Sequence, residues 1–305
     1  MQRPEPLAFY QPTSLPEAVR IMQEQGPGGH FLAGGTDLVI AIKEKGLAPR
    51  YVVDLKRLPA LAGIREHPDG ALTVGALTTL REVETSAVLR RKYPFVAQSA
   101  AEVGSIQIRH RATIGGNLAN ATPSADMAPA LLALDTTVTL VGEAGDRVMP
   151  LEAFFVGPGK TVMQRHEVLT ALTIPAHPPS TQGAYLKFSP REAMDLAYVS
   201  VAVALVLEDQ ERRCRLARIA LGAVAPTPMR ARQAEALLDR HIVTAELAAR
   251  VGAAAAQTCH PIDDVRASAA YRRAMVRVMT QRGVLNAAAA RAGPVAWVDR
   301  RERWD

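Results

Sequence analysis

The chain has 305 residues, of which 48% are hydrophobic and 22% are charged, values typical of an ordinary folded globular protein. The formal net charge is +6, but acidic residues are interleaved with the basic clusters and only 5% of residues are aromatic, which argues against a nucleic-acid surface. The longest apolar run, 196–207, is too short to span a bilayer, and the first residues lack a signal-peptide pattern. We therefore expect a cytoplasmic protein without a membrane span.

Cysteine and histidine usage limits the metal chemistry of this chain. The two cysteines, Cys214 and Cys259, cannot supply the four thiolates that hold an iron–sulfur cluster, and we expect both to be reduced. The seven histidines lack the spacing of a zinc site. His110 is interpreted as a strand or turn residue and not as a catalytic base.

The first part of the chain alternates helices and strands irregularly, which predicts an α+β fold and not a repeated βαβ array. Thr36 or Asp37 is placed to cap one helix, and Thr79 and Glu82 have the spacing of a capping box. The predicted helices cover residues 15–26, 36–46, 78–91, 93–103 and 124–135, and the predicted strands cover 30–35, 51–55, 71–77 and 136–142.

The composition changes near Pro175, where residues 173–183 are rich in Pro, Ser and Thr and are interpreted as a linker. Three strand-like runs follow at 184–188, 196–208 and 214–224, then two or three helices between about 230 and 290. We expect domains over 1–177 and 182–285 and a tail over 286–305, which contains both tryptophans and is either frayed or laid on a partner.

Two glycine pairs are the best candidates for a binding site. Gly34 and Gly35 join a strand to a helix start, where backbone amides suit an anion and glycine lets a phosphate approach. Taken alone, that pair is explained more simply by a tight capped turn. Gly115 and Gly116 repeat the pattern, so the two pairs could hold a diphosphate from opposite sides. The Rossmann and P-loop motifs are missing.

Asp126 follows the second glycine pair at a predicted helix start. It either caps that helix or contacts the polar part of a cofactor. From the residues alone, the prediction is a two-domain protein that binds a diphosphate-containing cofactor.

The order and spacing of these segments resemble a known family. LAGGTDL at 32–38, followed by IQIRHRATIGGNLANATPSADMAPALLAL at 106–134, is similar to the FAD-binding medium subunit of molybdenum hydroxylases. The likeness continues through 149–175 and 185–205 and covers the chain up to about Gly283. It implies a two-subdomain FAD-binding domain of the vanillyl-alcohol oxidase type, followed by a domain with a three-stranded antiparallel sheet and helices.

The resemblance also implies the residues that contact FAD. The first loop would cradle the pyrophosphate with Phe31, Leu32, Ala33, Gly34, Gly35, Thr36, Asp37 and Leu38. The second clasp would consist of Thr113, Ile114, Gly115, Gly116 and Asn117, with Val103 and Ala119 as further contacts.

Four more residues are assigned to the flavin by the same resemblance. Asp126 would hold its polar part, and Leu169 would pack near the ring system. Lys187 would reach the isoalloxazine, although an exposed strand lysine is the plainer interpretation. Asp195 belongs to a loop, 189–195, that in related enzymes affects acceptor access. Covalent-flavin proteins of this fold carry a histidine where this chain has Thr36 and Asp37, so FAD is expected to be non-covalent.

The implied function is an electron-transfer flavoprotein subunit. A small partner subunit would carry two [2Fe–2S] clusters and a large one the molybdenum cofactor, in a dimer of heterotrimers, and FAD would pass electrons to a terminal acceptor. Two alternatives stay open. One is a stand-alone flavin oxidase or dehydrogenase of the same fold, and the other is a basic, non-enzymatic binding module.

Overall fold

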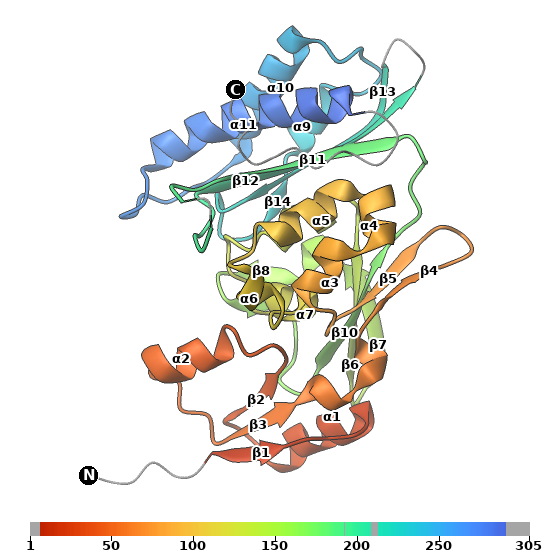
Figure 1. Ribbon diagram of the computed structural model, residues 1–305. Helices are drawn as coiled ribbons and strands as arrows, with labels where there is room; N and C mark the ends of the chain where they lie inside the picture. Colours follow the sequence, from red (N-terminus) through yellow and green to blue (C-terminus); the bar gives the residue numbers. More distant parts are fainter. Residues whose placement is uncertain (1–6, 192, 209–212, 291–305) are drawn as a thin grey trace.

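The computed structural model describes residues 7–191, 193–208 and 213–290. The structure consists of three successive layers (Figure 1). A small sheet forms the N-terminal layer, at one end of the molecule, and a sheet covered by helices forms the C-terminal layer at the opposite end. The part of the predicted tail at 291–305, with both tryptophans, lies outside the described residues. Within the described residues, no helix is long and apolar enough to cross a membrane.

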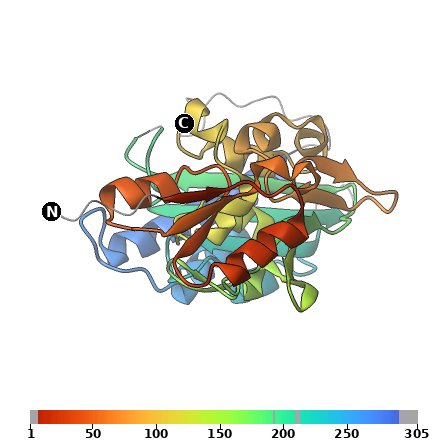
Figure 2. The same ribbon diagram turned by 90° about the horizontal axis from the view of Figure 1, so that it is seen from below.

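The N-terminal layer is a three-stranded parallel sheet in the order β1-β3-β2. Ser14 caps α1 by accepting from the Glu17 N–H, and the apolar face of this helix packs on β3. Figure 2 shows these elements in front of the rest of the molecule. Their bounds are β1 Ala8–Tyr10, α1 Leu15–Glu24, β2 Gly29–Leu32, α2 Leu38–Glu44 and β3 Tyr51–Asp54.

Helix α2 differs from α1 because none of its residues is buried. Val39 and Ile40 are each 42% exposed although both are large and apolar. The helix is therefore attached to the protein mainly through the loops at its two ends.

The middle layer contains a five-stranded sheet in the order β4-β5-β10-β6-β7. Short helices cover it and share one apolar core with it. The strands are β4 Ile64–Glu66, β5 Leu72–Gly75, β6 Thr137–Gly142, β7 Gly145–Pro150 and β10 Val168–Ile174, with a separate pair β8 Phe155–Gly157 and β9 Lys160–Thr161. The helices are η1 Leu55–Arg57, η2 Pro59–Leu61, α3 Leu80–Thr85, α4 Ala87–Lys92, α5 Pro94–Ala101, α6 Ile106–Arg109, α7 Ile114–Ala119, α8 Met127–Leu132 and η3 Leu151–Ala153.

The C-terminal layer is an antiparallel sheet with helices on its outer face (Figure 1). Its order β11-β12-β13-β14 has four strands where the sequence predicted three, because the two-residue β14 adds an edge. The elements are β11 Thr181–Phe188, β12 Val199–Glu208, β13 Arg213–Gly222, β14 Met229–Arg230, α9 Arg232–Ala236, α10 Ala245–Thr258 and α11 Ala269–Ala289.

Strand β12 explains the long apolar run in the sequence. Val201 and Val203 point into the core beneath the outer helices, whereas Ala202 and Ala204 face the core of the middle layer. Since successive side chains of a strand point to opposite faces, a strand covered on both faces is apolar throughout.

Three predictions of local structure are wrong in detail. The predicted helix 78–91 divides at Ser86, which caps α4 through its side chain. The segment 105–117 contains two short helices, so Gly115 and Gly116 lie within α7 and not between a strand and a helix start, and His110 lies in the turn after α6. The linker is shorter than predicted, because β10 runs to Ile174 and β11 begins at Thr181.

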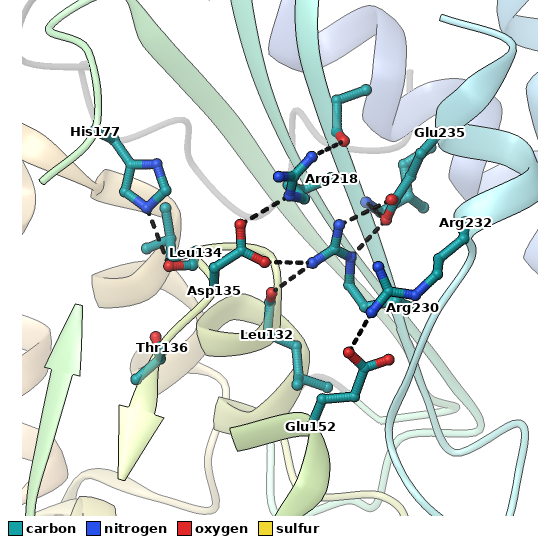
Figure 3. A network of polar contacts seen from close by, with 12 residues as sticks. Leu132, Leu134, Asp135, Thr136, Glu152, His177, Arg218, Arg230, Arg232 and Glu235 are labelled. Atoms are coloured by element: carbon teal, nitrogen blue, oxygen red, sulfur yellow. Dashed lines mark hydrogen bonds and ion pairs between the residues drawn. The ribbon is translucent and has the colours of Figure 1, made fainter. Parts of the chain in front are cut away.

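A network of charged residues joins the middle layer to the C-terminal sheet (Figure 3). The Arg230 side chain, 3% exposed, donates to Asp135 Oδ1 at 2.6 Å and to both carboxylate oxygens of Glu235 at 2.5 and 2.8 Å. Its Nη1 also donates to the Leu132 carbonyl, at the C-terminal end of α8. Arg218 adds a bond of 2.8 Å to Asp135. These contacts fix the end of α8 against the sheet.

We expect Arg230→Met to lower the free energy of unfolding by about 3–5 kcal/mol, because it removes the buried guanidinium and leaves the Glu235 carboxylate, whose side chain is only 10% exposed, without its ion-pair partner. The matched control is Arg232→Met, which removes an exposed pair with Glu152 and should cost less than about 1 kcal/mol. Urea unfolding followed by circular dichroism measures both, and equal effects would contradict the role of Arg230.

Candidate functional site

The first glycine pair forms the loop between β2 and α2. Gly35 has φ +81°, a conformation that other residues rarely adopt. Among the described residues, none accepts a hydrogen bond from the main-chain N–H groups of Gly34, Gly35, Thr36 or Asp37. Unpaired N–H donors gathered on one loop are the groups that bind a phosphate.

The two glycine motifs meet in space. A Cβ at Gly34 would lie only 2.0 Å from the main-chain oxygen of Arg111, so the first loop touches the backbone just before the second motif. Asn120 Nδ2, at the end of α7, donates to Asp37 Oδ1 at 3.0 Å. Asp37 holds the N-cap position of α2 but makes no side-chain cap bond, so the predicted capping is wrong for this residue. Its carboxylate connects the two motifs instead.

The second motif has its amides already paired within the protein. The Gly115 N–H donates to the Ala76 carbonyl at 2.9 Å, and the Gly116 N–H donates to Thr113 Oγ1 at 3.0 Å. The Asn117 N–H is paired too, but the buried side-chain oxygen Oδ1 of this residue has no partner among the described residues. A buried polar atom without a partner is costly, and a donor on a bound cofactor would satisfy it.

Lys56 supports the first loop and was not recognised in the sequence. Its Nζ donates to the Ala33 carbonyl at 3.3 Å and to Asp54 Oδ1 at 2.6 Å. Asp54 ends β3, and β2 and β3 are parallel neighbours, so both strands end beside this loop. The sequence signal was a pair of oppositely charged residues, Asp54 and Lys56, at the end of a buried strand.

Asp126 and Lys187 form a buried ion pair between α8 and β11. Lys187 Nζ donates to Asp126 Oδ2 at 2.9 Å and to the Glu102 carbonyl at 3.0 Å, and the Tyr185 hydroxyl donates to Asp126 Oδ1 at 2.8 Å. Asp126 stands at the N-cap position of α8 without a side-chain cap bond, so the capping interpretation is wrong. The Lys187 side chain is 4% exposed, so the interpretation as an exposed strand lysine is wrong as well.

Burial sets the protonation of this group. Burial raises the pKa of Asp126 to about 6, and Lys187 and Tyr185 act against that rise. Burial, then the nearby charge of Asp126, raises the pKa of Tyr185 well above its ordinary value. The phenol therefore remains a hydrogen-bond donor, and the carboxylate titrates within the range in which enzymes work.

The remaining predicted contacts are distributed around these two groups. Val103 directly follows Glu102, whose carbonyl accepts the hydrogen bond from Lys187. Leu169 is buried in β10, beside a shift in the register of its pairing with β6. Asp195 pairs with Arg191, which lowers the pKa of that carboxyl, and its loop is joined to Gly104 by the Met194 N–H. The others lie on the elements already described: Phe31 and Leu32 in β2, Leu38 in α2, and Ile114 and Ala119 in α7.

Comparison with known proteins gives the family. A model of the FAD binding domain in molybdopterin dehydrogenase matches residues 5–177, and one of the CO dehydrogenase flavoprotein C-terminal domain matches residues 184–287. Fold and site together thus define a two-part FAD-binding flavoprotein.

Relatives of known function agree over nearly the whole chain. The carbon monoxide dehydrogenase medium chain of Hydrogenophaga pseudoflava is 32% identical over 288 residues, 94% of this chain and 99% of that one. The xanthine dehydrogenase FAD-binding subunit of Escherichia coli is 30% identical over 294 residues, 94% of this chain and 97% of that one. A solved carbon monoxide dehydrogenase from Hydrogenophaga pseudoflava, which lacks the Mo-pyranopterin moiety, matches with a TM-score of 0.88 at 32% identity, over 94% of this chain and 98% of that one.

The chain belongs to the family of FAD-binding medium subunits of the molybdenum hydroxylases, which are oxidoreductases. The resemblance read from the glycine motifs and the expected α+β fold class are thereby confirmed. The assignment of individual residues to FAD stays a prediction.

We expect Gly34→Ala to reduce the FAD retained after gel filtration at least about tenfold, because the added Cβ overlaps the backbone of Arg111 and displaces the first loop. Gly157→Ala is the matched control, since open space surrounds that position. Equal flavin contents, measured by absorbance after denaturation, would refute the contact between the loops as a requirement for binding.

A second expectation concerns pH. The pKa of Asp126 is raised from 3.8 to about 6, so the folded chain binds this proton more tightly than the unfolded chain does. The resulting stabilisation is complete below about pH 4 and is lost as the pH rises to about 6. The free energy of unfolding of the flavin-free protein should therefore fall relative to that of Asp126→Asn across this window. A constant difference between the two proteins would exclude the raised pKa.

Proposed function

We propose that this chain is the electron-transfer subunit of a molybdenum-containing hydroxylase or dehydrogenase. It accepts electrons from [2Fe–2S] clusters of a small partner subunit and passes them to a terminal acceptor, while a large subunit with the molybdenum cofactor oxidises the substrate. The observation that carries the proposal is the direct contact between the two glycine motifs, at Gly34 and Arg111, beside the unpaired N–H groups of the first loop.

The chain's own residues fit FAD as a non-covalent cofactor. The N–H groups of residues 34–37 would bind the pyrophosphate, and the free Oδ1 of Asn117 would accept a hydrogen bond from the cofactor. Asp126 and Lys187 would face its flavin end as one buried pair. When bound, FAD supplies exchange between one-electron donors and two-electron acceptors.

The protein's contribution is to hold and enclose this cofactor. The loop at Gly34 has no room for a side chain, and α8 is fully buried, so both binding groups are rigidly placed. The names of the relatives support a multi-subunit assembly, because they are called medium chains or subunits of dehydrogenases. A dimer of heterotrimers in the cytoplasm is the arrangement that we propose.

The proposal is tested on the native complex, isolated through a tag on this chain. We expect two further chains to co-purify, with molybdenum, iron and FAD. Gly116→Val places side-chain atoms against Thr113 Oγ1, 2.9 Å from the position of a Cβ, and should remove FAD while molybdenum and iron are retained. Electron transfer to the acceptor should then fall by more than about tenfold.

Two outcomes would overturn the proposal. One is a lone yellow chain that oxidises an organic substrate without molybdenum or iron, which would establish the stand-alone oxidase. The other is a colourless chain that cannot be reconstituted with FAD, which would favour a non-enzymatic module.

A further inference from the structure

Tyr185 is a buried polar residue that neither the glycine motifs nor the family resemblance singled out. Tyr185 and Lys187 are two positions apart on β11, so both side chains leave the same face of the strand. That face meets the N-terminal end of α8, where the two side chains donate to the two oxygens of Asp126, at 2.8 and 2.9 Å. Tyr185 is 1% exposed and Asp126 is 6% exposed.

The backbone that carries Asp126 is fixed independently of Tyr185. At the other end of α8, Arg230 donates to the Leu132 carbonyl and to Asp135 (Figure 3). Along the helix, Pro129 packs so closely on Gly222 of β13 that a Cβ there would lie 2.8 Å from the proline ring. The position of α8 is thus determined by the sheet, and the rotation of the Asp126 carboxylate is left to its two hydrogen-bond donors.

The two donors have unequal freedom. The Lys187 ammonium group stands at the end of a flexible side chain and also donates to the Glu102 carbonyl. The Tyr185 hydroxyl, in contrast, is attached to a rigid ring within the apolar core. A rigid donor defines the orientation of its acceptor more closely than a flexible one does.

We infer that Tyr185 is a positioning residue of the flavin site, whose hydroxyl holds the Asp126 carboxylate, and through it the Lys187 ammonium, in the orientation that bound FAD meets. The inference rests on the proposed function, because it assigns this buried pair to the cofactor. It adds a residue of the C-terminal domain that sets the geometry and charge at the flavin without touching the pyrophosphate clasp.

The charged and titratable groups around Asp126 determine the direction of the effect. Lys187 and Tyr185 face it from β11, and both favour its ionised form, whereas burial and the negative charge of Glu102, after α5, oppose ionisation. Removing the phenol hydroxyl deletes one stabilising donor to the carboxylate. The protonated form then persists to higher pH.

The test uses Tyr185→Phe, which removes only the hydroxyl, with Tyr93→Phe as a matched control. Tyr93 is 3% exposed, and its hydroxyl donates to the Pro175 carbonyl, away from Asp126.

In the flavin-free chain, the titration midpoint of Asp126, followed by carbon NMR of aspartate-labelled protein, should move to higher pH in Tyr185→Phe only. In the FAD-loaded chain, the same variant should bind FAD about two- to tenfold more weakly, the value of one hydrogen bond. Its visible spectrum and midpoint potential should also differ from those of the control.

A double variant separates positioning from general destabilisation. In the Asp126→Asn background, Tyr185→Phe should cause no further change in the spectrum or the potential, because the carboxylate that it orients is gone. Additive effects, or an unchanged Asp126 titration in Tyr185→Phe, would overturn the inference while leaving FAD binding and the proposed function intact. A wild-type chain that binds no FAD would instead refute the proposed function itself.

Discussion

The contact between the backbone at Gly34 and the backbone at Arg111 is the constraint on which the rest of the site depends. It joins the N-terminal parallel sheet to the helical part of the middle layer without any intervening side chain. Because main-chain atoms touch, the distance between the two glycine loops is set by van der Waals radii and not by flexible side chains. The unpaired N–H groups of the first loop are thereby held in a fixed place beside α7.

The two motifs look alike in sequence but play different physical roles. The N–H groups of the first loop have no partner among the described residues. The N–H groups of the second glycine pair donate instead to the Ala76 carbonyl and to Thr113 Oγ1. The second motif therefore serves as a closely packed support that presents Asn117. Because the first loop supplies the hydrogen-bond donors and the second motif supports it rigidly, the binding site is already formed before the ligand arrives.

The sequence predicted what depends on local chemistry. The capping box at Thr79 and Glu82 is present, and the apolar run of β12 is a strand covered on both faces. The division of the predicted helix at Ser86 was missed because one serine can continue or cap a helix, and packing decides between the two.

The buried polar group was only partly predictable for a different reason. Asp126 and Lys187 were chosen from the resemblance, but their mutual bond depends on how β11 packs on α8, which no local pattern encodes. Tyr185 was missed altogether, since an isolated tyrosine in an apolar strand looks like ordinary core. Lys56 was missed similarly, because its acceptor Ala33 belongs to the loop after the neighbouring strand β2.

Helix α2 has a thermodynamic consequence that follows from its lack of buried residues. Its residues add almost no apolar burial to the folded chain, so global unfolding and local opening of this helix are separate equilibria. Substitutions at Val39 or Ile40, on the exposed surface of α2, should therefore change the free energy of global unfolding little, because they remove almost no buried apolar area.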